Sequence, residues 1–260
     1  MSDGLKVSVL VPVYNELHTV ERVIERVRSI DVQTQIILVD DCSQDGTRDL
    51  LRKMAERDEE DLTILFHETN RGKGAAIRTA LAAANGDVTI VQDADMEYDP
   101  VEYPALLAPI EHGVADVVYG SRFLGGPHRV LFFWHQLGNQ FLTLLSNVLT
   151  NLNLTDMETG YKAFRTDLLK QMRLTADRFG FEPEVTARVA QMRCRLYEVP
   201  ISYWGRDYSA GKKITWRDGF AALWFIFKFN VTDRMPPVTS SPDRADWQGS
   251  PAQFGTKVDS

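Results

Sequence analysis

The segment Val88-Thr89-Ile90-Val91-Gln92-Asp93-Ala94-Asp95-Met96-Glu97 joins a short apolar run to three acidic residues spaced two apart. The apolar run predicts a buried strand, and ligands of open α/β sheets sit at the carboxyl ends of the strands. At such a position Asp95 and Glu97 can hold a hard divalent cation, a natural partner of a diphosphate, and Asp93 can reach a sugar hydroxyl. The alternative is a solvated acidic loop, which describes most short acidic runs.

Around this segment, short apolar runs alternate with segments of helical period, which predicts an α/β fold with a mostly parallel sheet flanked by helices. The expected strands are Val7–Val13, Ile36–Asp40, Thr63–Phe66, Val88–Gln92 and Val117–Gly120. The expected helices are Glu16–Ser29, Thr47–Arg57, Lys73–Ala84 and Val101–Glu111. No GxGxxG follows the first strand, and Asn70–Gly74 lacks P-loop spacing, so we expect a tight turn there, with phosphate contact as the alternative.

After Gly120 the pattern changes to longer helices. We expect a helix over Val130–Leu152 that is interrupted at Gly138-Asn139, short elements, a helix over Phe181–Met192 and a strand at Leu196–Pro200. An amphipathic helix near 216–231 is apolar around most of its circumference and has basic flanks, which fits a core helix or one in a membrane interface. Residues 1–234 are expected to form one domain, and 235–260, rich in Pro, Ser and Asp, a disordered tail.

Charge divides along the chain. Residues 1–120 hold 11 Lys and Arg against 23 Asp and Glu, a net charge of −12, whereas residues 121–234 hold 16 against 10, a net charge of +6. An acidic, metal-attracting half therefore faces a basic, phosphate-attracting half, and the overall acidity argues against a nucleic-acid partner.

Two further features concern location. Two cysteines and an N-terminus unlike a signal peptide predict a cytoplasmic protein. The longest apolar run, Phe220–Phe227, has eight residues, whereas crossing a bilayer takes roughly 20. We therefore expect any membrane contact to be peripheral.

Three segments fall at one edge of the expected sheet: Val11–Glu16, Val39–Thr47 and Asp93-Ala94-Asp95. Together they resemble the inverting family 2 glycosyltransferases with the GT-A fold, which use a nucleotide-sugar donor. The resemblance implies that Pro12, Tyr14 and Glu16 line the nucleoside pocket, Asp41 contacts uracil or guanine, Asp93 contacts the ribose or sugar, and Asp95 with Glu97 holds Mg²⁺ or Mn²⁺.

In the second half, Gly120–Phe123, Asp156–Lys162 and Arg206–Lys213 are similar to the polyprenyl-phosphate branch of that family, which includes dolichyl-phosphate mannose and glucose synthases. The resemblance implies transfer of a hexose from GDP-mannose or UDP-glucose to a polyprenyl phosphate at the cytoplasmic membrane face. No QxxRW-type motif is found near the C-terminus, which fits this branch.

Candidate catalytic residues are Asp95, Arg122 and Asp156. Candidate ligands for the acceptor phosphate are Arg122, Arg206, Lys212 and Lys213, and Arg122 is favoured because it directly follows an expected strand and Arg clamps phosphate in a bidentate manner. Asp156 and Glu158 orient these cations or, with a hydroxyl acceptor, serve as general base. Two alternatives stay open: a soluble or glycan hydroxyl acceptor, and a non-catalytic sugar-nucleotide-binding or scaffold subunit.

Overall fold

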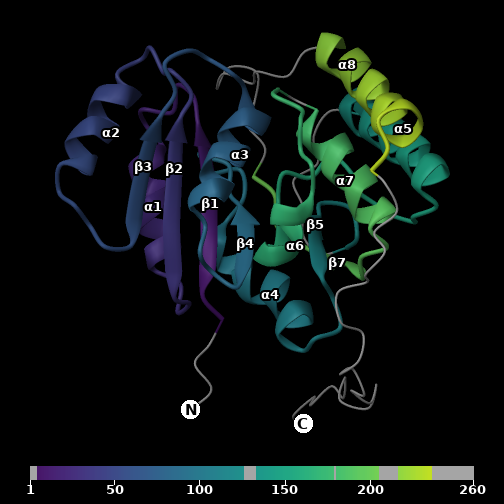
Figure 1. Ribbon diagram of the computed structural model, residues 1–260, viewed down its shortest axis with the longest axis horizontal. Coiled ribbons are helices and arrows are strands. Elements are labelled where there is room, and N and C mark those ends of the chain that lie inside the picture. Colours follow the sequence, from purple (N-terminus) through teal and green to yellow (C-terminus); the bar gives the residue numbers. More distant parts are fainter. Residues whose placement is uncertain (1–4, 126–132, 179, 205–215, 236–260) are drawn as a thin grey trace.

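A computed structural model describes residues 5–125, 133–178, 180–204 and 216–235, and only the backbone of 216–218. Its centre is one sheet with the strand order β3-β2-β1-β4-β6-β5-β7 (Figure 1). The strands are β1 (Val7–Val13), β2 (Thr34–Asp40), β3 (Leu62–Phe66), β4 (Val88–Val91), β5 (Val117–Ser121), β6 (Lys162–Arg165) and β7 (Leu196–Pro200).

Helices cover both faces of the sheet and extend beyond it. The helices are α1 (Val20–Arg28), α2 (Thr47–Ala55), α3 (Lys73–Ala83), α4 (Tyr103–Glu111), α5 (Phe133–Thr150), α6 (Thr166–Gln171), α7 (Phe181–Gln191) and α8 (Trp216–Phe227), with single turns η1 (Pro100–Glu102) and η3 (Lys228–Thr232). The expected helix Val101–Glu111 is thus a 3₁₀ turn followed by α4, and α8 continues into a π-helical turn.

The order of the strands identifies the edge at which open α/β sheets bind their ligands. The chain runs outward from β1 through β2 to β3 and then returns to β4 on the other side of β1. In open α/β sheets such a reversal separates the loop after one central strand from the loop after its neighbour, here the loops after β1 and β4, and ligands bind between them. We call this edge of the sheet the crevice. All neighbouring pairs are parallel except those made by β6, which confirms the expected mostly parallel sheet.

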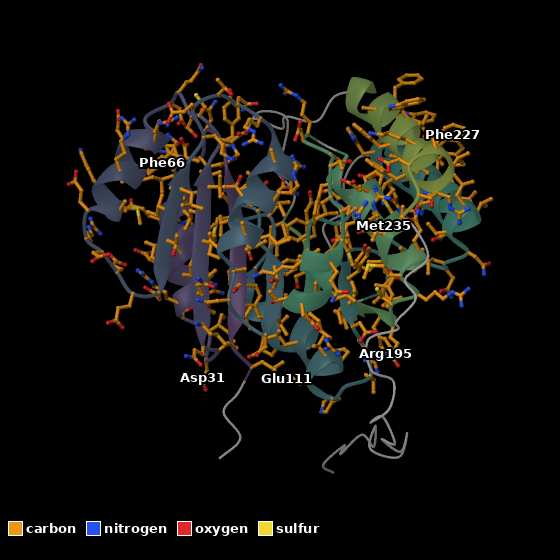
Figure 2. The ribbon with its side chains drawn as sticks, in the orientation of Figure 1. Asp31, Phe66, Glu111, Arg195, Phe227 and Met235 are labelled. Atoms are coloured by element: carbon orange, nitrogen blue, oxygen red, sulfur yellow. The ribbon has the colours of Figure 1, made fainter. Side chains whose placement is uncertain are left out.

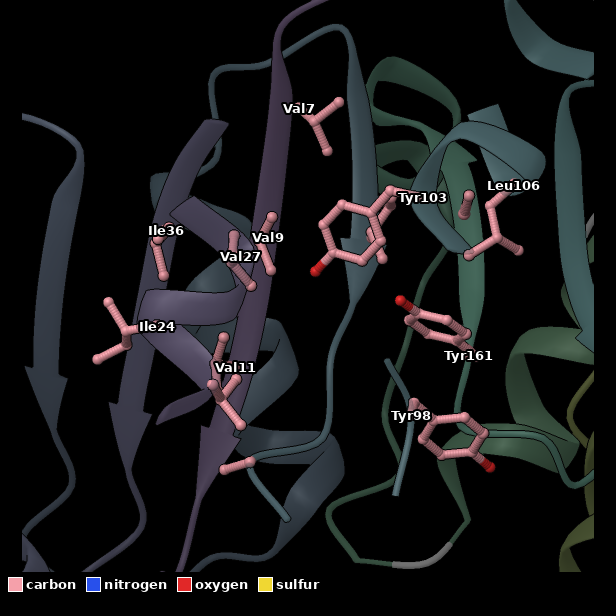
Figure 3. Close-up of a cluster of buried hydrophobic side chains, with 14 of the residues drawn as sticks. Val7, Val9, Val11, Ile24, Val27, Ile36, Tyr98, Tyr103, Leu106 and Tyr161 are labelled. Atoms are coloured by element: carbon pink, nitrogen blue, oxygen red, sulfur yellow. The ribbon is translucent and has the colours of Figure 1, made fainter. Parts of the chain in front are cut away.

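The side chains of the strands pack into two hydrophobic cores, one on each face of the sheet, because successive residues of a strand point to opposite faces. On one face Val7, Val9 and Val11 pack with side chains of α1 and α4, and Figure 3 shows Tyr103 and Leu106 of α4 in this cluster. On the other face the buried side chains of β1 and β2 pack against α3, in a cluster that continues to α6 and α7. The central strands β1, β4 and β5 are therefore almost entirely buried, whereas the edge strands β3 and β7 are partly exposed.

At one end of the molecule, α5 and α8 lie beside α7 (Figure 1). Ile226 of α8 and Phe229 of η3 are fully buried, so this segment is partly core. Its opposite side is exposed, and Figure 2 shows Phe227 on the outer surface. In the part of the chain that the structure covers, no helix is both long and apolar enough to cross a membrane.

The first helix begins later than expected. Residues from Glu16 to Thr19 form a turn, and α1 starts at Val20. Asn15 adopts a left-handed φ of 55°, and its backbone N–H donates to Ser43 Oγ at 2.9 Å. The chain is thereby held at the sheet edge, which leaves Tyr14 and Glu16 in a loop beside the crevice.

The second half departs from expectation in two places. Helix α5 runs through Gly138-Asn139 without interruption, because the Asn139 side chain bonds to Asp156 and does not compete for its own backbone. Residues Val130–Phe132 of that expected helix lie outside the residues that the structure describes. The short antiparallel strand β6 was not expected, and it inserts between β4 and β5.

Candidate active site

The loop after β1 is bonded to the loop after β2. Gln44 N–H donates to Asn15 Oδ1 at 2.8 Å, and Glu16 N–H donates to Thr47 Oγ1 at 3.0 Å. Tyr14 is 36% exposed beside the crevice, and Pro12 lies half-buried within β1 opposite Val39. The structure thus brings Pro12, Tyr14 and Glu16 to one edge, and their contacts with a nucleoside stay a prediction.

Asp41 holds the neighbouring turn in place. Its buried carboxylate accepts the backbone N–H groups of Arg71 and Gly72 at 2.8 and 2.6 Å. The same carboxylate lies 2.8 Å from His67 Nδ1. Asp41 therefore shapes the Asn70–Gly74 turn that opens α3, and its contact with a base stays a prediction.

Asp93 is joined to a lysine that the sequence analysis did not single out. Lys73 Nζ lies 2.8 Å from Asp93 Oδ1 and 3.0 Å from Glu182 Oε1. Burial opposes the charged form of Lys73, but the two carboxylates outweigh it and raise the lysine pKa. The Gly-Lys-Gly run at the start of α3 was the only sequence signal for this residue. Lys73 is a fixed cation at the crevice.

Asp95 and Glu97 offer oxygen ligands to a cation. Glu97 N–H donates to Asp95 Oδ1 at 3.1 Å, so the backbone wraps around the first carboxylate. Among the described residues no group of three or more His, Cys, Asp or Glu side chains could hold a metal by itself. Mg²⁺ is usually bound by one or two carboxylates together with waters and substrate phosphates, which fits this donor set.

Arg122 and Asp156 form a buried ion pair directly after β5. Arg122 Nε and Nη2 donate to the two oxygens of Asp156 at 2.6 and 2.8 Å. The Asp156 carboxylate is fully buried and also accepts the Arg122 backbone N–H at 3.2 Å. Burial opposes the charged form of Asp156, but Arg122 outweighs it and lowers the pKa of this carboxyl. Asp156 is therefore a poor proton acceptor and a firm support for Arg122.

Aromatic side chains connect this ion pair to the acidic segment. The Arg122 guanidinium lies over the Tyr203 ring, 5.1 Å from its centroid. The Tyr203 hydroxyl donates to Glu97 Oε2 at 2.7 Å, and the Tyr98 ring packs 5.3 Å from that of Tyr203. No sequence pattern pointed to Tyr203. Tyr203 thus links the phosphate-binding candidate Arg122 to the metal-binding candidate Glu97.

Beneath these residues lies a second pair of titratable groups, Glu158 and Lys162. Lys162 is fully buried and donates to the carbonyl of Met157 at 3.0 Å and to that of Thr159. Burial and the nearby Glu182 raise the pKa of Glu158, whose Oε1 is buried without a hydrogen-bond partner. Burial also lowers the pKa of Lys162. Burial thus works against the charged form of both side chains. The remaining phosphate-binding candidates Arg206, Lys212 and Lys213 lie outside the described residues.

The fold aligns with solved structures of a glycosyltransferase. Glucosyl-3-phosphoglycerate synthase from Mycobacterium tuberculosis, crystallised with Mn²⁺, UDP and glucosyl-3-phosphoglycerate, aligns with a TM-score of 0.65 at 20% identity over 86% of this chain and 80% of that chain. A second crystal structure of that enzyme, with Mg²⁺ and UDP, aligns with a TM-score of 0.61. The fold is that of the GT-A nucleotide-diphospho-sugar transferases.

Sequence comparison narrows this class. Residues 8–173 match the family described as Glycosyl transferase family 2. The undecaprenyl-phosphate mannosyltransferase of Micrococcus luteus is 31% identical over 222 residues, which cover 80% of this chain and 87% of that protein. The polyprenol monophosphomannose synthase of Mycolicibacterium smegmatis is 29% identical over 211 residues, 78% of this chain and 79% of that protein. The chain belongs to glycosyltransferase family 2 and to its polyprenyl-phosphate sugar synthase branch.

Proposed function

We propose that this protein transfers a hexose from a nucleotide-sugar, GDP-mannose or UDP-glucose, to a polyprenyl phosphate, with inversion at the anomeric carbon. Residues 1–234 would act as one catalytic domain. The observation that carries the proposal is the buried Arg122–Asp156 pair. It provides a held cation for an acceptor phosphate and no exposed carboxylate at this position to act as a base.

The acceptor chemistry agrees with that arrangement. A phosphate monoester has a second pKa near 6, so at neutral pH it is already a nucleophile and needs no strong general base. A hydroxyl acceptor needs a base, and Asp156 has a lowered pKa because Arg122 outweighs the cost of its burial. Since Asp156 occupies Nε and Nη2 of Arg122, an acceptor phosphate would bind at the Nη1 side of the guanidinium.

On the donor side, Tyr14 and Glu16 would line the nucleoside pocket, and Lys73 would hold Asp93 in position toward the sugar. Asp95 and Glu97 would hold Mg²⁺ or Mn²⁺, which neutralises the diphosphate and makes it a better leaving group. Tyr203 fixes the Glu97 carboxylate by its 2.7 Å hydrogen bond. Donor and acceptor phosphates would therefore meet between Glu97 and Arg122.

The acceptor also requires a membrane, and one surface suits it. Exposed large apolar side chains gather on α5, α8 and η3: Phe133, Trp134, Leu137, Phe141, Leu144, Val148, Phe220, Trp224, Phe227 and Val231. The net charge of +6 over residues 121–234 complements an anionic lipid surface. We propose that this lipid-facing surface binds the cytoplasmic face of the membrane peripherally.

The testing experiment incubates the protein with labelled GDP-mannose or UDP-glucose and vesicles that contain a polyprenyl phosphate. We expect label to enter the lipid fraction, and expect transfer to stop in excess EDTA or after Asp95→Ala. A matched control is Asp49→Ala, an exposed carboxylate on α2. Transfer that persists without divalent ions would refute the metal role. Label on a soluble or glycan hydroxyl with none in lipid would favour the alternative acceptor, and nucleotide binding without turnover would favour a non-catalytic subunit.

A further inference from the structure

Helix α5 presents two different faces. Its exposed apolar residues Leu137, Phe141, Leu144 and Val148 follow the spacing of one helical stripe. Polar residues at positions 139, 143 and 147 form another stripe, spaced by four. Residues two apart, such as 137 and 139, point about 200° apart on an α-helix, since each residue turns the chain by about 100°. One side of α5 can therefore contact lipid while the other faces the protein.

The polar stripe binds the segment that carries Asp156. Asn139 Nδ2 donates to Asp156 Oδ1 at 3.2 Å, and the buried Thr143 Oγ1 accepts Met157 N–H at 3.1 Å. Asn147 completes the series, because its amide donates to the Leu154 carbonyl at 2.8 Å and accepts the Leu154 N–H at 3.1 Å. Three successive turns of α5 thus bond to Leu154, Asp156 and Met157.

The other side of this segment is anchored in the sheet. Glu198 of β7 accepts the backbone N–H groups of Thr155 and Asp156 at 2.9 and 3.2 Å. Ser121 Oγ at the end of β5 lies 2.6 Å from Thr155 Oγ1. The position of Asp156, and through it that of Arg122, is therefore set jointly by the sheet and by α5.

We propose that Asn139, Thr143 and Asn147 are positioning residues that couple the contact of α5 with the membrane to the placement of Arg122. The inference rests on the proposed function. A polyprenyl phosphate is anchored in the bilayer, so its phosphate lies at a fixed depth, and Arg122 must reach that depth. A misplacement of about 1 Å in a reacting complex can cost about 100-fold in rate. An acceptor free in solution can follow a displaced Arg122, and an anchored acceptor cannot.

The test compares two acceptors: a long-chain polyprenyl phosphate in anionic vesicles and a short-chain, water-soluble prenyl phosphate without vesicles. The variants are Asn139→Ala and Thr143→Val, which removes the hydroxyl at nearly constant volume. Thr143→Ser restores the hydroxyl, and Gln140→Ala changes an exposed polar residue of the same helix. For each protein we would measure kcat and KM for both acceptors, the dissociation constant of the donor nucleotide, and sedimentation with vesicles.

We expect Asn139→Ala and Thr143→Val to lower kcat/KM for the anchored acceptor at least tenfold more than for the soluble one. Donor binding and vesicle sedimentation should stay unchanged, and Thr143→Ser and Gln140→Ala should behave like the wild type. Equal losses with both acceptors would overturn the coupling and assign these residues a purely structural role. If the wild-type protein uses neither acceptor, the proposed function itself is wrong and the inference falls with it.

Discussion

Replacing Asp156 by Asn tests whether this carboxylate supports Arg122 or removes a proton from the acceptor. Asn keeps the shape and one acceptor oxygen, but it places an amide N–H₂ against the guanidinium in place of an oxygen. Removing one partner of a buried ion pair typically costs about 3–5 kcal/mol. The Arg122 side chain is 17% exposed, so water can recover part of this loss. We therefore expect Asp156→Asn to lower the free energy of unfolding by about 2–4 kcal/mol.

A double-mutant cycle with Arg122→Gln separates the two roles. If the residues act as a pair, the double variant loses less stability than the sum of the single variants, with a coupling energy of about 1–3 kcal/mol. Their effects on acceptor kcat/KM should also be non-additive, because either change disrupts the same phosphate-binding group. Urea unfolding and kinetics at saturating donor, from pH 6 to 9, would measure both quantities.

The base hypothesis predicts the opposite pattern. Loss of a general base costs roughly 10²–10⁴-fold in rate and alters the pH dependence of kcat. An Asp156→Asn variant with nearly wild-type stability, additive effects with Arg122→Gln and a kcat reduced a hundredfold would refute the ion-pair explanation. Donor affinity must be measured in parallel, so that a change in donor binding is not mistaken for either role.

Three further changes test other parts of the structure. Gly160→Ala would place a methyl 2.5 Å from Asp93 Oδ2 and 3.3 Å from Lys73 Nζ. We therefore expect the free energy of unfolding to fall by about 1–3 kcal/mol and donor binding, measured by calorimetry, to weaken. The control Gly138→Ala, whose new methyl meets nothing within 4 Å, should not destabilise the protein. The free energy of unfolding of Glu158→Gln should rise relative to that of the wild type between about pH 4.5 and about pH 8, because over this range the folded wild type keeps a proton on Glu158 that the unfolded chain releases. Urea titrations that show the same stability difference between the two proteins across this range would contradict the prediction. Trp134→Ser and Trp224→Ser should each weaken binding to anionic vesicles by roughly tenfold in a sedimentation assay, because each removes about 1–2 kcal/mol of apolar burial in the membrane. Phe225 is kept unchanged in this test, because it packs on Gly180 and Phe229 and its loss would damage the core.

Local patterns predicted much of the fold correctly. The alternation of apolar strands and amphipathic helices gave the mostly parallel sheet, because strand and helix periods are properties of neighbouring residues. The same logic placed Tyr14, Asp41 and Asp93 at one edge, since parallel strands end on the same side of a sheet. The structure confirms that placement, and the roles of these residues in binding a nucleotide-sugar stay predictions.

The sequence alone therefore determined the class of fold and the motif residues at its ligand edge. Only the tertiary structure decided their partners: Asp156 for Arg122, 34 residues away, and Glu97 for Tyr203, 106 residues away. It also decided which side of α8 is core and which is exposed, because the sequence shows apolar residues on both sides. The physical reason is that burial and ion pairing depend on segments brought together by the sheet, and β6 in particular carries the 156–161 segment to Asp93 by pairing antiparallel with β4.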